Sequence, residues 1–149
     1  MLYAILLPLH SVVRWLVVLA AVAVVGLSFY GWLGKKSWTP LDERVGMLFP
    51  MILDIQVLIG IILYFFASPL TLGLLRNFQS AMRNPDVRYF GTEHSLLMVI
   101  ALIVAHIGRS ISRKAVDAPA KHRAAALLFG LSVLIVLAAI PWSRPLLRF

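Results

Sequence analysis

Four apolar stretches, each long enough to cross a lipid bilayer as a helix, take up most of this sequence. Inside a bilayer every backbone polar group must be satisfied within the protein, which leaves transmembrane helices or a closed barrel. The stretches are continuous and lack the alternation of apolar and polar residues that barrel strands show. With 61% hydrophobic residues in a chain of 149, a soluble domain could not bury this much apolar surface. The sequence therefore predicts an all-α membrane protein.

The four spans that we expect are Leu9–Leu33, Val45–Ala67, Thr92–Ser112 and Ala124–Trp142. They would form one integral membrane four-helix domain that covers residues 1–149. Pro50 in the second span lies either in the first helical turn, where proline is tolerated, or at a kink one turn before Asp54. We expect the first span to remain in the mature protein, because Arg14, its first basic residue, lies within the apolar stretch and not before it.

The distribution of basic residues predicts the orientation of the bundle. The larger set belongs to the loops after the first and third spans and comprises Lys35, Lys36, Arg44, Arg109, Arg113, Lys114, Lys121 and Arg123. The smaller set lies on the opposite side and comprises Arg76, Arg83, Arg88, Arg144 and Arg148. Because cytoplasmic loops carry the excess of Lys and Arg, we expect both termini to face outward, away from the cytoplasm. We attribute the net charge of +8 to basic loops near the lipid bilayer and expect no nucleic-acid partner.

The connection between the second and third spans, residues 68–91, has the pattern of a short amphipathic helix. Its apolar residues recur at helical spacing and are Leu74, Leu75, Phe78 and Met82. The opposite face carries Arg76, Asn77, Gln79, Ser80 and Arg83, and Asn84-Pro85 ends the pattern. We therefore expect a helix that lies on the membrane surface. A loop with ordinary helical propensity is the alternative.

Two of the spans open with the same His-Ser pair, in "LPLHSVVRW" and in "TEHSLLM". Because both spans start on the same side, His10 and His94 are expected at nearly equal depth, within about one helical rise of ~1.5 Å. Two imidazoles at equal depth on neighbouring helices can hold one metal centre. The chain has no cysteine, so we favour a b-type haem with these histidines as its axial iron ligands. The alternative is that each histidine bonds a lipid headgroup or a backbone carbonyl.

Arg14 follows His10 by four residues and therefore shares its helix face. A cation within a span normally faces the bundle interior or a polar partner. A haem propionate would be such a partner, and so would Glu93, which precedes His94. The alternative is that Arg14 extends to the outer headgroups.

A second polar group lies deeper in the spans and consists of Asp54, Gln56 and His106. Asp54 and His106 are expected at similar depth, where they would form a proton-handling pair or one wall of a quinone headgroup site. A buried structural hydrogen bond between helices is the alternative. His106 follows His94 by twelve residues, which rotates it ~120° away, so we expect one haem. His122 lies in a basic loop and is expected to be a solvated cation near lipid.

Several short motifs, in order over nearly the whole chain, are similar to one known family: "HSVVRW", "LIGIILYF", "EHSLLM", "IGRS" and "AIPW". The chain resembles short bacterial four-helix membrane proteins labelled cytochrome b or cytochrome b561-like. This resemblance implies haem b and electron transfer with quinones, in a multi-pass protein of the bacterial inner membrane. The positions that match its motifs are His10, Arg14, Glu93 and His94.

Three functions remain open from the sequence. The first is a b-type cytochrome that transfers electrons between a quinone or quinol and a partner, such as another membrane electron-transfer subunit. The second is a non-catalytic accessory subunit of a larger respiratory or photosynthetic membrane complex. The third is a proton-coupled transporter that uses Asp54 and His106, for which one four-helix chain offers no convincing inverted repeat. We assign no residue a catalytic role.

Overall fold

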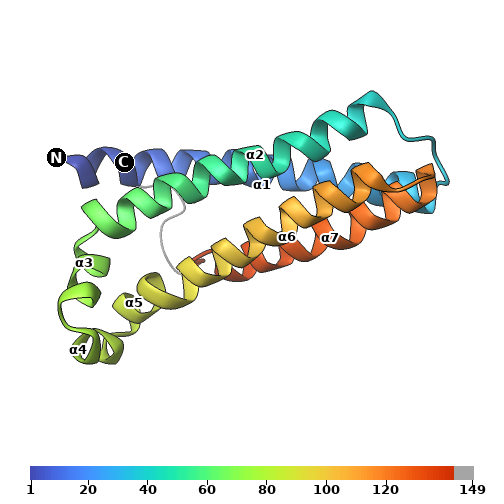
Figure 1. The fold of residues 1–149 in the computed structure, drawn as a ribbon. Coiled ribbons are helices and arrows are strands. Elements are labelled where there is room, and N and C mark those ends of the chain that lie inside the picture. Colours follow the sequence, from blue (N-terminus) through green and yellow to red (C-terminus); the bar gives the residue numbers. More distant parts are fainter. Residues whose placement is uncertain (143–149) are drawn as a thin grey trace.

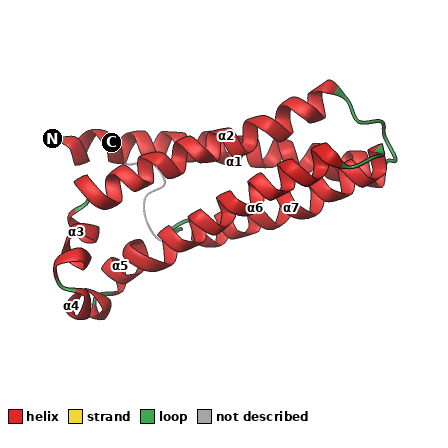
Figure 2. Ribbon diagram, in the orientation of Figure 1, coloured by secondary structure: helices red, strands yellow, loops and turns green. Residues whose placement is uncertain are grey.

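Four long apolar helices make up most of the computed structural model, which describes residues 1–142 (Figure 1). They are α1 (Leu2–Leu33), α2 (Pro40–Ile62), α6 (His94–Lys114) and α7 (Ala118–Ala139). Each is long and apolar enough to cross a membrane, counting the helical turns that continue α2 and precede α6. No strand occurs within the described part of the chain (Figure 2). The predicted all-α fold with four helices suited to span a membrane is confirmed.

Successive long helices run in opposite directions, so that α1 begins and α7 ends at the same end of the bundle (Figure 1). We call this the cavity end, because a pocket opens there. The opposite end holds the connections 34–39 and 115–117 and is called the basic end. Of the basic residues that predict the orientation, Arg144 and Arg148 lie outside the described residues.

Helix α2 begins several residues earlier than expected, because a polar cap starts it. The Thr39 hydroxyl accepts a hydrogen bond from the Asp42 amide at 3.3 Å, and the Asp42 carboxylate accepts one from the Thr39 amide at 2.8 Å. Pro40 takes the first helical position, where its missing N–H costs nothing. Pro50 therefore lies inside the helix, so the first of its two expected placements, in the first turn, is excluded.

The connection between α2 and α6 is helical, as predicted, but divided into short segments. The π-helical turn η1 (Leu63–Ala67) continues α2, and η2 (Tyr89–Glu93) precedes α6. Between them lie α3 (Pro69–Arg76), α4 (Phe78–Arg83) and α5 (Pro85–Arg88). Asn77 interrupts the expected single helix. Its backbone is not helical, and its side chain accepts a hydrogen bond from the Ser80 amide at 3.1 Å to cap α4.

The core of the bundle is packed most closely between α6 and α7. The α6 residues that face α7 are small, and a methyl group added to Gly108 would lie 2.9 Å from Leu128 Cβ. Small residues let transmembrane helices approach closely. The Ser132 hydroxyl donates a 2.8 Å hydrogen bond to the Ala101 carbonyl across this contact. Phe49 of α2 meets Phe129 of α7 edge to face, with ring centres 5.7 Å apart and both side chains fully buried.

His122 lies inside the basic end and is not the solvated cation that the sequence predicts. Its side chain is 1% exposed, and its ring centre lies 4.9 Å from that of Trp38. The expectation was wrong because α7 begins at Ala118, which places His122 one turn inside the helix. There it packs against α1 at Gly31, where an added Cβ would overlap the imidazole.

Arg109, which the sequence places among the cytoplasmic loop cations, also contributes to the interior of the basic end. Its guanidinium forms an ion pair with Glu43 of α2, and the Arg109 side chain is only 16% exposed. The Trp38 indole donates a 3.0 Å hydrogen bond to the other carboxylate oxygen of Glu43. Helices α2 and α6 are thus joined by polar contacts at this end.

Candidate functional site

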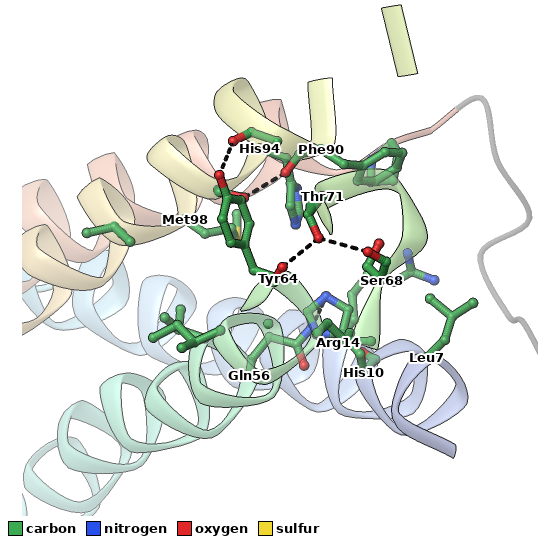
Figure 3. Close-up of a pocket in the computed structure, with 18 of the residues that line it drawn as sticks. Leu7, His10, Arg14, Gln56, Tyr64, Ser68, Thr71, Phe90, His94 and Met98 are labelled. Carbon is green, nitrogen blue, oxygen red and sulfur yellow. Dashed lines mark hydrogen bonds between the residues drawn. The ribbon is translucent and has the colours of Figure 1, made fainter. Parts of the chain in front are cut away.

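A cavity of about 590 Å³ lies between α1 and α2 on one side and α6 on the other (Figure 3). Ligand and cofactor pockets commonly measure ~300–1,000 Å³. Much of the lining is apolar and includes Leu7, Val17, Leu53, Val57, Met98 and Val136. The polar side chains on the wall include His10, Arg14, Gln56 and His94. The cavity is therefore a mainly apolar pocket with a small set of polar groups.

His10 and His94 face this cavity from different helices (Figure 3). Their ring centres lie 6.4 Å apart, and the ring planes are inclined at 73°. His10 belongs to the early turns of α1 and His94 is the first residue of α6. The two spans start at the same end of the bundle, so the two histidines have similar depth. They lie together, as the sequence predicts.

The hydrogen bond of His94 determines which ring nitrogen carries its proton. Nδ1 lies 2.7 Å from the carbonyl oxygen of Ala139, near the end of α7. A carbonyl only accepts hydrogen bonds, so Nδ1 must donate, and Nε2 of the neutral ring keeps its lone pair. A histidine whose second nitrogen donates to a backbone carbonyl is the usual arrangement of a metal ligand.

Gln56 contacts His10 and not the polar group to which the sequence assigns it. Its side-chain amide nitrogen lies 3.0 Å from the His10 carbonyl oxygen and 3.2 Å from Nε2 of the His10 ring. The amide nitrogen donates both bonds, so Nε2 accepts and Nδ1 carries the proton of the neutral ring. Within residues 1–142, His10 Nδ1 and Gln56 Oε1 are buried polar atoms without a hydrogen-bond partner. Such atoms are uncommon, and Arg109 Nη1 and His122 Nδ1 at the basic end are two others within the same residues.

Arg14 and Glu93 are placed differently with respect to the cavity. Arg14 lies on the cavity wall one turn after His10 (Figure 3). Glu93 is absent from that wall and forms a 2.9 Å ion pair with Arg88, in which both side chains are about half exposed. Adjacent helical residues project about 100° apart, so Glu93 turns away where His94 turns inward. The structure does not bring Glu93 to Arg14.

Asp54 and His106 meet on the outer surface of the bundle. His106 Nε2 lies 2.9 Å from Asp54 Oδ1, and the two side chains are 53% and 46% exposed. The expected contact is present as a hydrogen bond between α2 and α6, and it is half exposed in the described chain. Gln56 lies two residues after Asp54 and therefore projects about 200° away from it, into the bundle.

Several residues of the cavity wall were not predicted from the sequence. The Tyr64 hydroxyl donates a 2.9 Å hydrogen bond to the Gly91 carbonyl, and the Thr71 hydroxyl donates a 2.7 Å bond to the Tyr64 carbonyl. These bonds join η1, α3 and η2 around the cavity (Figure 3). π-Helical turns of this kind are frequent at functional sites. Met98 had a usable signal, since it follows His94 by one helical turn.

Comparison of the chain with family models, with curated proteins and with solved structures finds no match. Its function is therefore inferred from the geometry of the site. Two imidazoles with a defined tautomer, a nearby cation and apolar walls can hold a flat, largely apolar cofactor that contains a metal ion.

Proposed function

We propose that this chain is a membrane b-type cytochrome that transfers electrons between a quinone or quinol and a partner, with one haem b held between α1 and α6. The observation that carries the proposal is the pair His10 and His94, which face one apolar cavity with ring centres 6.4 Å apart. The motif resemblance to cytochrome b proteins is consistent with it.

The spacing of the two rings suits a metal ion bound between them. The ring centres lie 6.4 Å apart, close enough for both histidines to reach one metal ion. Within residues 1–142, no group of three or more His, Cys, Asp or Glu side chains is arranged to hold a metal. A porphyrin, which supplies four ligands of its own, suits a site with two protein ligands.

The residues of this chain would hold and tune the haem in separate ways. His10 and His94 would bind the iron, and the Ala139 carbonyl would orient the His94 ring. His10 would use Nε2 for this, so the Gln56 amide would have to give up its 3.2 Å contact with that atom. Arg14 would attract a propionate carboxylate, and the apolar walls would keep water from the porphyrin. Gln56 would hold the α1 backbone at His10 through its 3.0 Å bond to the carbonyl. Bound haem supplies an iron that carries one electron at a time.

The proposed setting follows from the fold and the charge pattern. The four apolar helices indicate a multi-pass membrane protein. We propose the bacterial inner membrane, with both termini outward and the basic end toward the cytoplasm. The haem would then lie near the outer surface, where quinol in the bilayer and other electron-transfer subunits have access.

The first test is a reduced-minus-oxidised visible spectrum of the purified protein in detergent, with haem quantified as its pyridine complex. We expect a six-coordinate b-type spectrum close to one haem per chain. His10→Ala and His94→Ala should each abolish it. His106→Ala is the matched control, because His106 lies on the outer surface, and it should retain the full haem content.

Two outcomes would count against the proposal. One is full haem retention in both His10→Ala and His94→Ala. The other is a colourless wild-type protein that takes up no added haemin. If that colourless protein also copurified with large membrane partners, the accessory-subunit function would be favoured.

A further inference from the structure

The contact between Asp54 and His106 is polar, but it lies on the exposed surface of two candidate membrane spans. Both side chains are about half exposed, and both helices are candidate membrane spans. The nearest exposed residues one turn toward the cavity end are Leu58 on α2 and Ile103 on α6. The pair is thus a small polar site within an apolar surface.

Ionisable side chains are expensive in the hydrocarbon region and normally face the bundle interior or a polar pathway. The bond from His106 Nε2 to Asp54 Oδ1 satisfies one atom on each side chain. No other hydrogen bond of either side chain is present in the part of the chain that the structure describes. His106 Nδ1 and the second oxygen of Asp54 are therefore available to a molecule that approaches from the bilayer.

We propose that Asp54 and His106 bind the polar headgroup of a lipid-dissolved quinone or quinol, which enters directly from the bilayer. The Asp54 carboxylate accepts a hydrogen bond from Nε2–H of the neutral ring, so His106 Nδ1 has a lone pair for the hydroxyl of a quinol. When the ring is protonated, Nδ1 donates to the carbonyl of a quinone instead. Leu58 and Ile103 offer aliphatic surface to the rest of the molecule. Both redox forms are recognised by the same two side chains.

The position of the pair relates this site to the cavity. Asp54 lies on the outer side of the α2 turns whose inner side contributes Leu53, Gln56 and Val57 to the cavity wall. A headgroup at Asp54 is separated from the cavity by about one helix diameter, ~10 Å. Electron transfer between this site and the cavity rests on the proposed function, because it requires the haem. Binding of the quinone headgroup by Asp54 and His106 does not require it.

A second copy of this chain is the other molecule that could cover the pair. Closely packed helices in a bilayer present small residues to each other. Ser110 is a small exposed residue within a turn of the pair. Leu58 and Ile103 toward the cavity end and Met51 toward the basic end are instead large and apolar. This surface therefore suits a small flexible lipid better than a helix.

The test uses the full chain in lipid nanodiscs and decylubiquinone as the probe, with binding followed by quenching of tryptophan fluorescence. His106→Gln and Asp54→Asn keep the side-chain size but change the donors and acceptors. Each should raise the Kd about tenfold or more. Ser110→Ala, exposed one turn from His106 on the same helix, is the matched control and should leave the Kd unchanged.

Photolabelling with an azidoquinone locates the binding site independently. We expect the label on α2 and α6 near residues 54 and 106. Equal Kd values in wild type and both variants would overturn this inference. The inference would also be overturned if the variants changed dimer formation but not quinone binding. That result would mean that a second copy of the chain covers Asp54 and His106.

Haem content distinguishes failure of this inference from failure of the proposed function. Variants that keep the b-type spectrum but bind decylubiquinone normally would refute the quinone site alone. A protein without haem whose quinone binding still depends on Asp54 and His106 would refute the cytochrome and support this site.

Discussion

At the basic end of the bundle, side chains from all four long helices fill the space between them, whereas at the cavity end the helices leave a pocket of about 590 Å³. The His122 ring packs over Gly31 and beside Trp38 at the basic end. At the cavity end, His10 and His94 face an open space. One histidine is thus enclosed by packed side chains, whereas the other two line a cavity.

The difference shows where this small membrane protein is closely packed and where it is open. Lipid is as apolar as the helix surfaces, so helices are held together by packing and polar contacts and not by removal of apolar surface from water. The basic end has both kinds of contact. The cavity end keeps its polar contacts but has an open space in place of packed side chains, so substitutions next to that space should cost less stability.

The largest expected contrast is between two phenylalanines. Phe129 is fully buried against Phe49, and Phe129→Ala should lower the free energy of unfolding by about 3–5 kcal/mol. Phe90 lines the cavity, so Phe90→Ala enlarges an existing space and should cost roughly half as much. Thermal or SDS-induced unfolding in detergent, followed by circular dichroism, measures both. Equal losses would show that the cavity end is as tightly packed as the basic end.

Two glycines give the next contrast. Gly31→Ala places a Cβ in the space of the His122 ring, and displacement of that ring should cost about 1–3 kcal/mol. The nearest atom to an added Cβ at Gly60 is His10 Cε1, at 3.6 Å. Gly60→Ala should therefore be neutral, or stabilising by up to about 1 kcal/mol, because alanine favours helix. The same unfolding assay tests both, and a neutral Gly31→Ala would contradict the close packing of His122.

Two ion pairs allow a smaller comparison. Arg109 and Glu43 join α6 to α2 with the arginine largely buried, so Glu43→Gln should lower stability by about 1–2 kcal/mol. Arg88 and Glu93 are each about half exposed, so Glu93→Gln should cost about 0–1 kcal/mol. Raising the salt concentration should weaken only the exposed pair noticeably. A larger loss of stability from Glu93→Gln than from Glu43→Gln would show that the ion pair at the cavity end contributes more than the one at the basic end.

The long apolar stretches were sufficient to predict the fold, because they leave a membrane-spanning chain few alternatives. The helix ends were less predictable. Thr39 and Asp42 start α2 before its apolar residues begin, and Pro8 lies within α1 although the expected span started after it. Helix ends depend on local capping bonds, and the bounds of an apolar stretch do not indicate where those bonds form.

The depth of site residues could be predicted from the sequence, but their rotation about the helix axis could not. Position along the spans predicted that His10 lies near His94 and Asp54 near His106, and both contacts are present. Which way Gln56, Glu93 and His122 face depends on how each helix is turned toward its neighbours. Gln56 faces His10, Glu93 pairs with Arg88, and His122 packs against Gly31. Neighbouring helices determine these orientations.

The smallest expected contrast is between two helix caps. Thr39 caps α2, a long helix whose first turns carry the contacts of the basic end, and Thr39→Ala should lower stability by about 1 kcal/mol. Asn77 caps α4, a short exposed helix, so Asn77→Ala should open α4 locally with little effect on global unfolding. Hydrogen exchange separates the two effects, because the first variant should speed exchange throughout α2 and the second only near residues 78–83. Faster exchange throughout the bundle in Asn77→Ala would show that the short helices also hold the cavity end together.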